Sequence, residues 1–162
     1  MTVHYFAYAS NMSLAQMRER CPESMKVGIG QLPGHRLVFP RFSKNRQCGV
    51  ASVEPHAPST VWGVVFHLTA EDALRLDRFE GHVPDRHPTL NNYNRTVVPV
   101  HAEGLQTGPM DCMTYVATVQ GEHFAPSADY HGLILRGARE NGLPPHYLDF
   151  LSGLFRQYDP AG

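Results

Sequence analysis

Runs of apolar residues, broken by polar or Gly/Pro positions, divide this chain into short strands and a few helices. Residues 61–68 are nearly all apolar and either β-branched or aromatic, which is typical of a strand buried on both faces. Residues 25–54 show two or three shorter strand-like runs, separated by Pro33-Gly34 and by the polar run 43–47. This pattern predicts a sheet in the first half of the chain.

A strand, a tight turn and a helix are expected close to the N-terminus. Residues 5–9 form a short aromatic run, and Ser13 is followed three residues later by Gln16, the spacing of a capping box. The helix is predicted to run to Arg20 and to end at Cys21-Pro22. The turn presents backbone N–H groups and a helix N-terminus, which together attract a carboxylate or phosphate.

A second helix is predicted to begin at Thr69, where Asp72 completes the start signal, and to end at Gly81. Its apolar side consists of Ala70, Ala73, Leu74 and Phe79. Glu80 falls at the last helical position, where the helix dipole and the neighbouring aromatic residue both raise the pKa of a carboxyl group. Glu80 is therefore a candidate base, although an exposed glutamate in a last helical turn is the plainer interpretation.

The second half of the chain adds strands and two further helices. Residues 82–92 have the composition of a loop, and 93–101 and 110–119 are predicted strands joined by a Gly-rich turn. Ser127 and Gly142 bound one predicted helix, and Pro144-Pro145 begins another that runs to about Phe155. Together these elements predict an α+β domain on a mixed or antiparallel sheet that can curl into a barrel.

Length, charge and cysteine content narrow the class of protein. The 162 residues are expected to form a single domain over 1–162, and the net charge of −1 is spread over interspersed charges. No basic patch indicates nucleic acid, no apolar run is long enough for a membrane, and no signal-peptide pattern is seen. Three distant cysteines, Cys21, Cys48 and Cys112, suggest buried reduced thiols and a cytoplasmic location.

Four stretches, in order along the chain, resemble the gamma-glutamylcyclotransferase family, which has the AIG2-like fold. They are Tyr-Phe-Ala-Tyr-Ala-Ser-Asn-Met at 5–12, Val-Trp-Gly-Val-Val-Phe at 61–66, Leu-Asp-Arg-Phe-Glu-Gly at 76–81 and Gly-Ala-Arg-Glu-Asn-Gly-Leu-Pro at 137–144. The resemblance spans residues 5 to about 150. It implies a small β-barrel surrounded by helices.

The resemblance also implies a reaction. In that family the α-amine of a gamma-glutamyl compound attacks its own side-chain carbonyl, expels the attached amine and releases 5-oxoproline. This acyl transfer is a lyase-type cyclisation of glutathione metabolism, and it needs a small-molecule substrate, no metal and no organic cofactor. Glu80 matches the acid/base residue of the family.

The resemblance places the substrate against the N-terminal turn. The positions implied as substrate-binding are Tyr5, Phe6, Ala7, Tyr8, Ala9, Ser10, Asn11, Tyr93 and Tyr130. Ala9 departs from the family, which usually has glycine there. Either the local φ is negative and alanine fits, or the pocket is altered.

Three other interpretations stay open at this point. Glu80, His82, Asp85 and His87 are ligand types, but their spacing matches no common zinc motif. Cys48 as the nucleophile of a hydrolase would need a histidine that the sequence does not place beside it. A non-catalytic gamma-glutamyl or carboxylate-binding protein of the same fold is the third. The leaving amine and the oligomeric state, with a homodimer as one option, are left undetermined.

Overall fold

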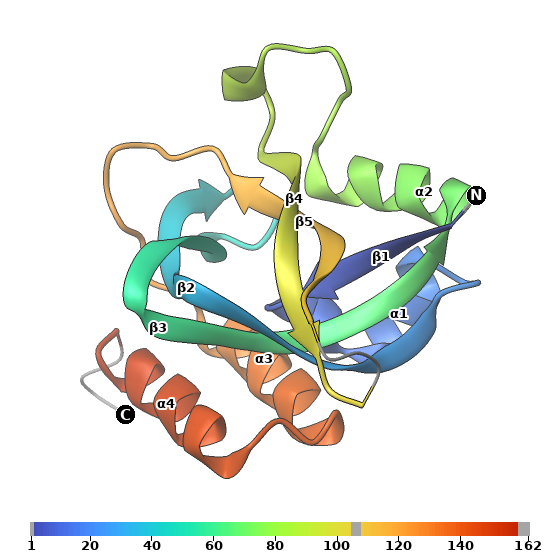
Figure 1. The fold of residues 1–162 in the computed structure, drawn as a ribbon. Coiled ribbons are helices and arrows are strands. Elements are labelled where there is room, and N and C mark those ends of the chain that lie inside the picture. The colour runs from blue at the N-terminus through green and yellow to red at the C-terminus, as the bar shows by residue number, and fades with distance from the viewer. Residues whose placement is uncertain (1, 105–107, 159–162) are drawn as a thin grey trace.

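A closed five-stranded barrel forms the centre of the computed structural model, which describes residues 2–104 and 108–158 (Figure 1). Its strands are β1 (Thr2–Ala7), β2 (Met25–Ser43), β3 (Cys48–Thr69), β4 (Tyr93–Ala102) and β5 (Met110–Ala117). They follow one another around the barrel in the order β1-β3-β2-β4-β5. The pairing is antiparallel except between β1 and β5, which run parallel. The predicted α+β fold with a small mixed barrel is thereby confirmed.

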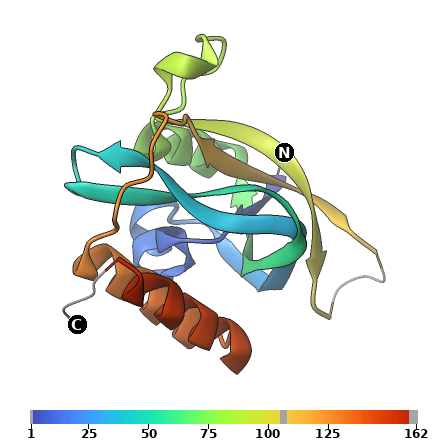
Figure 2. The same ribbon diagram turned by 90° about the vertical axis from the view of Figure 1, so that its left-hand side faces the viewer.

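Helices cover the outside of this barrel. They are η1 (Ser10–Met12), α1 (Leu14–Arg20), α2 (Ala70–Glu80), η2 (Pro88–Leu90), α3 (Ala128–Glu140) and α4 (Pro145–Arg156). In both ribbon views α3 and α4 lie together below the barrel, and α2 lies above it (Figures 1 and 2). The segment between α2 and β4 projects beyond the rest of the molecule (Figure 1). The middle of the Gly-rich turn expected between β4 and β5, residues 105–107, lies outside the described residues.

Strands β2 and β3 are longer than the sequence pattern suggests. Residues 25–54 do not form two or three short strands, because β2 continues through Pro33-Gly34 with a shift in register between Pro33 and His35. Gly34 has a φ of 70°, and this conformation accommodates the irregularity without ending the strand. The polar run at 43–47 does form the turn into β3, as predicted.

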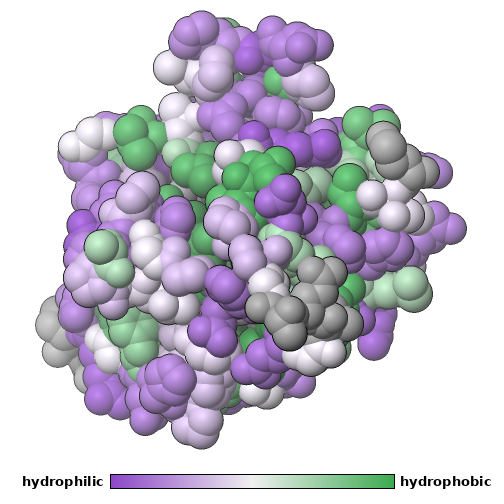
Figure 3. All heavy atoms as spheres, in the orientation of Figure 1, coloured by the Kyte–Doolittle hydropathy of each residue, from purple (hydrophilic) through white to green (hydrophobic). Residues whose placement is uncertain are grey.

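The interior of the barrel is aromatic and aliphatic, with Phe6, Phe39 and Phe66 among its fully buried side chains. Strand β1 pairs with β3 on one side and β5 on the other, so its end is held firmly inside the molecule. Hydrophilic residues cover most of the face drawn in Figure 3. Within the described part of the chain, no helix combines the length and apolar character that crossing a membrane requires.

Helix α2 begins and ends as predicted, but it buries a different face. The Thr69 side chain accepts a hydrogen bond from the backbone of the first turn, and Gly81 ends the helix with a φ of 69°. Of the four residues expected on the apolar side only Ala73 is buried, whereas Leu74 and Phe79 are 56% and 53% exposed. The buried side of α2 includes Asp77, whose carboxylate accepts a hydrogen bond from Arg95 of β4. A polar residue therefore occupies a buried position where the hydrophobic pattern predicts an apolar residue.

Candidate active site

The turn between β1 and α1 forms one wall of the site. Strand β1 ends at Ala7, two residues earlier than predicted, and the chain enters the 3-10 turn η1 before Ser13 caps α1. The Ser13 hydroxyl accepts a hydrogen bond from the Gln16 backbone at 3.2 Å, which confirms the predicted cap. Ala9 has a negative φ of −133°, so this position does not adopt the left-handed conformation that favours glycine.

Only half of the capping box is formed, and this frees a side chain for the site. The Gln16 side chain does not accept a hydrogen bond from the backbone N–H of the N-cap residue Ser13. It donates instead to Ser10 Oγ at 3.0 Å and to Asn11 Oδ1 at 2.8 Å. Glu140, at the end of α3, accepts a hydrogen bond from the backbone of Leu14 at 2.7 Å and so satisfies the first turn of α1. Helix α3 thus satisfies a further backbone donor at the start of α1, while the Ser13 N–H donates to the Ser10 carbonyl at 3.1 Å.

The C-terminal end of α3 also fixes the turn itself. Asn141 is buried and donates from Nδ2 to the backbone carbonyl of Met12 at 2.7 Å. A Cβ atom at Gly137 would lie 2.9 Å from both Met12 Cβ and Ser13 N, so only glycine permits this close approach. Gly137 and Asn141 therefore have a structural role: they allow α3 to pack closely against the turn.

Glu80 is held in place by an anchor one helical turn before it. Asp77 accepts hydrogen bonds from Arg95 Nε at 3.1 Å and Nη2 at 2.8 Å, and from the Tyr115 hydroxyl at 2.6 Å. These bonds tie α2 to β4 and β5. Glu80 then emerges at the end of α2 beside the turn, and Gly81 redirects the chain.

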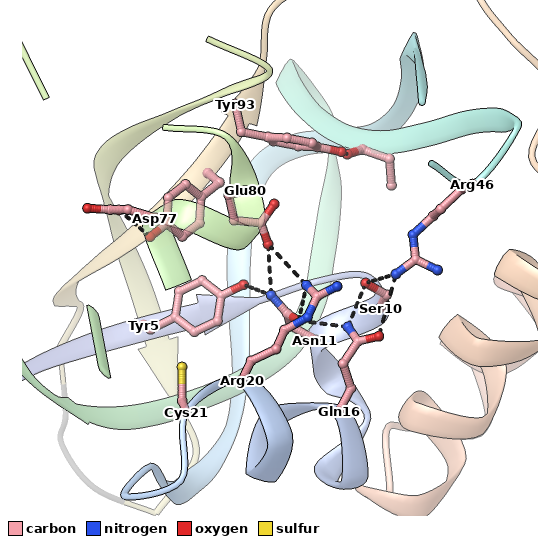
Figure 4. A network of polar contacts seen from close by, with 12 residues as sticks. Tyr5, Ser10, Asn11, Gln16, Arg20, Cys21, Arg46, Asp77, Glu80 and Tyr93 are labelled. Carbon is pink, nitrogen blue, oxygen red and sulfur yellow. Dashed lines mark hydrogen bonds and ion pairs between the residues drawn. The ribbon is translucent and has the colours of Figure 1, made fainter. Parts of the chain in front are cut away.

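A polar network centred on Asn11 connects the turn to Glu80 (Figure 4). Asn11 Nδ2 donates to Glu80 Oε1 and to the Tyr5 hydroxyl, both at 2.9 Å. Its Oδ1 accepts from Gln16 and from Arg20 Nη1, the latter at 3.1 Å. All four hydrogen-bonding positions of the Asn11 amide are used, which fixes its orientation. Arg20 also forms an ion pair with Glu80 at 3.8 Å.

The surroundings of Glu80 favour its protonated form more than water does. Its side chain is 14% exposed, and burial raises the pKa of the carboxyl above the ordinary value of 4.5. Arg20 and the Asn11 amide oppose this rise in pKa. The Phe79 ring is 53% exposed and lies against the Arg20 guanidinium, 4.9 Å from the ring centroid. The direction of the pKa shift is as predicted, and burial is its largest cause.

Glu80 lines a cavity of about 40 Å³ that is enclosed mainly by tyrosines. Its lining residues are Tyr5, Tyr8, Ala9, Ser10, Asn11, Ala51, Glu80, Tyr93, Tyr115 and Tyr130. The structure therefore brings together most of the residues implied at the sequence level. Phe6 and Ala7 are the exceptions, because both are fully buried in the barrel core and do not line the cavity.

The tyrosine hydroxyls around this cavity differ in where their protons point. Those of Tyr8, Tyr93 and Tyr115 donate to protein oxygens, for example from Tyr93 to the Ala51 carbonyl at 2.6 Å. The hydroxyl of Tyr130 instead accepts from the Ala51 N–H at 3.0 Å, and that of Tyr5 accepts from Asn11. Neither of these two hydroxyls donates to another described residue, so each has a proton to offer a ligand. Burial raises the pKa of both, which keeps them protonated.

Four residues of the site were not found from the sequence: Arg20, Arg46, Ala51 and Tyr115. Gln16 and Arg20 lie four positions apart on α1 and so share one polar face, a spacing that suggests a common target. Arg46 comes from the turn between β2 and β3, where nothing local distinguishes it from any exposed arginine. Its guanidinium stacks on Tyr130, 4.9 Å from the ring centroid.

This geometry gives little support to a metal site or to a cysteine hydrolase. Among residues 2–104 and 108–158, no three His, Cys, Asp or Glu side chains gather as metal ligands do. His82 faces the backbone of β4, and His87 caps η2. Cys48 is 4% exposed and packs in the core, where a substrate does not reach it.

Comparison with known proteins agrees with this arrangement. The model of the AIG2-like family matches residues 60–151. The gamma-glutamylcyclotransferases of Mus musculus and Homo sapiens are each 27% identical to the chain, over 94% and 93% of its length and 79% and 77% of their own. A solved structure described as a gamma-glutamyl cyclotransferase superimposes with a TM-score of 0.83 at 27% identity and covers 94% of this chain and 87% of that one.

Proposed function

This chain belongs to the AIG2-like family, and on that premise we propose that it is a gamma-glutamylcyclotransferase, which releases 5-oxoproline from a gamma-glutamyl compound. The observation that carries the proposal is the buried Glu80 carboxylate in the wall of a small cavity formed largely by tyrosines. Glu80 Oε1 is held by Asn11, and its other oxygen, Oε2, accepts no hydrogen bond from any described residue. That oxygen is the one we assign as the proton acceptor.

The proposed reaction is an intramolecular acyl transfer. The α-amine of the glutamyl group attacks the γ-carbonyl carbon, a five-membered ring closes, and the bond to the leaving amine breaks. Glu80 accepts a proton from the attacking amine and returns it to the departing nitrogen, so no water is consumed. A small cavity suits this reaction, because it holds the substrate folded with its amine beside its carbonyl.

The negative charge in this reaction needs hydrogen-bond donors. The γ-carbonyl oxygen becomes an oxyanion, and the glutamyl α-carboxylate is charged throughout. We assign the Tyr130 hydroxyl proton to the oxyanion and the Ser10 hydroxyl with the turn backbone to the carboxylate. The Tyr5 hydroxyl is a further donor on the same wall. No cofactor is required, because side chains supply both the proton transfer and the charge stabilisation.

Tyr93 and Tyr130 form a matched pair for a test of these roles. Both hydroxyls bond to the backbone of Ala51, so Tyr93→Phe and Tyr130→Phe each remove one such bond and should lower stability by a similar amount, about 1 kcal/mol. Of these two tyrosines, Tyr130 is the one whose hydroxyl proton is free of a described acceptor and so can be donated to the oxyanion. We expect Tyr130→Phe to lower kcat about 100-fold, and Tyr93→Phe to lower it far less. Steady-state kinetics and thermal melts measure the two effects separately, and equal losses of kcat would contradict the assignment.

The proposed activity is tested directly by measuring 5-oxoproline. Purified protein is incubated with gamma-glutamyl amino acids, gamma-glutamyl amines and glutathione, and 5-oxoproline and the released amine are quantified by chromatography. We expect the two products in equal amounts from at least one class. If the folded protein binds such compounds and releases nothing, the alternative of a non-catalytic binding protein replaces the proposal.

The proposed location is the cytoplasm. All three cysteines are free thiols and buried. Burial raises the pKa of Cys21 to about 12 and that of Cys112 to about 11, so both thiols resist oxidation. This arrangement suits a reducing compartment.

A further inference from the structure

Two acidic residues of α2, one helical turn apart, each face an arginine from another element. Asp77 is held closely by Arg95 of β4, whose Nε and Nη2 lie 3.1 and 2.8 Å from its two carboxylate oxygens. Glu80 meets Arg20 of α1 through a single contact, from Nη1 to Oε1 at 3.8 Å. The closely bonded aspartate anchors the helix, whereas the glutamate with the longer contact is the group that we assign to proton transfer. The contrast between the two pairs points to a role for Arg20.

The Arg20 guanidinium is held on several sides. Arg20 lies in the last turn of α1, where the helix dipole favours a cation. Its Nη1 donates to Asn11 Oδ1 at 3.1 Å, and the guanidinium lies 4.9 Å from the centroid of the Phe79 ring. The backbone carbonyl of Arg20 accepts a hydrogen bond from Arg75 Nε of α2 at 3.1 Å. These contacts hold the side chain, which is 19% exposed, beside Glu80 (Figure 4).

Arg20 and Asn11 act on the same oxygen of Glu80. Asn11 Nδ2 donates to Oε1 at 2.9 Å, and Arg20 Nη1 approaches the same atom at 3.8 Å. Arg20 also binds the amide oxygen of Asn11, so it fixes the amide group that holds the carboxylate. Both stabilising groups therefore lie at Oε1, and Oε2 is left as the oxygen with no donor among the described residues.

Arg20 is the cation closest to Glu80 among residues 2–104 and 108–158, where no other lies within ion-pair distance. Arg46, from the turn between β2 and β3, also favours the charged carboxylate, whereas Asp77 disfavours it. His82 faces the backbone of β4 instead. Burial raises the pKa of the hydroxyl and thiol groups around the carboxylate and keeps them neutral, namely those of Tyr5, Tyr8, Cys21, Tyr93, Tyr115 and Tyr130.

We propose that Arg20 is a positioning residue of the reaction: it keeps Glu80 as a carboxylate until the substrate is bound, and it directs proton transfer to Oε2. This inference rests on the proposed cyclotransferase activity and adds a residue to its mechanism. Glu80 has to accept a proton from the attacking amine, and a carboxyl group that is already protonated cannot do so. A close two-point pair like that of Asp77 would instead hold the carboxylate charged too firmly for it to take up a proton. The single longer contact meets both needs.

The pH profile of activity tests this role. Arg20→Met removes the charge and keeps a long side chain, so the acid limb of kcat/KM should move to higher pH. On the acid side we expect kcat/KM to be about 10-fold below the wild-type value, and the difference should shrink as pH rises. Arg20→Lys keeps the charge, so its acid limb should stay close to that of the wild type.

The matched control for these variants is Arg18→Met, the same change at an exposed position of α1, which should leave the whole profile unchanged. If Arg20→Met lowers kcat/KM by the same factor at every pH, Arg20 has a merely structural role and the inference is overturned.

Thermal stability across pH provides a second readout that does not require turnover. Without Arg20 the buried charge of Glu80 is less well compensated, so the folded-state pKa of Glu80 rises further above 4.5. The loss of Tm in Arg20→Met should therefore be small at acid pH, where Glu80 is protonated, and should grow as pH rises. In the Glu80→Gln background the same substitution should change Tm equally at every pH.

The two readouts separate this inference from the proposed activity. A loss of Tm in Arg20→Met that does not depend on pH when Glu80 is present would overturn the inference, whatever the activity. If the loss depends on pH through Glu80 but no compound yields 5-oxoproline with the wild-type protein, the proposed activity falls and the charge coupling between Arg20 and Glu80 stands.

Discussion

Glu80→Gln is expected to lower kcat for 5-oxoproline release by about 100- to 10,000-fold. Glutamine keeps the size of the side chain, and its Oε1 still accepts the hydrogen bond from Asn11 that fixes the group. It has no basic oxygen, so the attacking amine loses its proton acceptor and the leaving nitrogen loses its proton donor. Substrate affinity should change much less than kcat, because the cavity walls stay in place.

The control for this substitution lies on the same helix. Glu71→Gln makes the same chemical change at an exposed position in the first turn of α2, and we expect it to leave kcat at the wild-type value. Circular dichroism confirms that both variants are folded. A Glu80→Gln enzyme with the wild-type rate would remove Glu80 from the mechanism.

The pH dependence of the wild-type protein offers an independent check on Glu80. Because burial raises its pKa above 4.5, kcat/KM should fall on the acid side at a pH above that value. The folded protein also binds this proton more tightly than the unfolded chain. The contribution of Glu80 to stability therefore decreases as pH rises from 4.5 through the folded-state pKa, and Glu80→Gln should be the more stable protein at neutral pH. Thermal melts across pH would show the two proteins converging at acid pH.

Gly137→Ala is the second substitution with a large expected effect. The added methyl group would lie 2.9 Å from Met12 Cβ and Ser13 N, so α3 and the turn must move apart. We expect a loss of about 1–3 kcal/mol in the free energy of unfolding. The same displacement moves Ser10 and Asn11, and kcat/KM should fall about 10- to 100-fold.

Gly132→Ala provides the opposite case within α3. A Cβ at Gly132 meets nothing within 4 Å, so alanine should raise helix propensity and stabilise the protein by up to about 1 kcal/mol. Activity should be retained. Denaturant unfolding and kinetics on the two variants compare the same residue change at a tight and an open position, and a neutral Gly137→Ala would show that the contact with the turn is unimportant.

The features predicted most accurately from the sequence were the helix starts. Ser13, Thr69 and Ser127 each accept a hydrogen bond from the backbone of the first turn that follows. Such caps depend on a few consecutive residues, so the sequence contains the necessary information. The length of β2 was predicted wrongly, because whether Pro33-Gly34 breaks a strand or only bends it depends on the β3 partner.

The residues of the site show the same contrast between features that local sequence predicts and features that depend on distant parts of the chain. Glu80, Tyr93 and Tyr130 were proposed from motif positions, and the structure places them around one cavity, while their chemical roles stay predictions. Arg46 was not predicted as a site residue, because its position beside Ser10 depends on the conformation of the turn between β2 and β3. Which face α2 buries likewise depended on bonds from Asp77 to distant strands.

The parallel pairing of β1 with β5 has a consequence for how the molecule is assembled. The Thr114 hydroxyl donates to the carbonyl of Phe6, 108 positions away along the chain, and Asn141 holds the carbonyl of Met12 across 129 positions. Contacts of such sequence separation form slowly, since a long stretch of chain must be ordered before they are made. During synthesis on the ribosome, β1 and the turn after it therefore cannot form these contacts until β5 and α3 have been made. An incomplete nascent chain has every residue of the N-terminal motif and no working pocket.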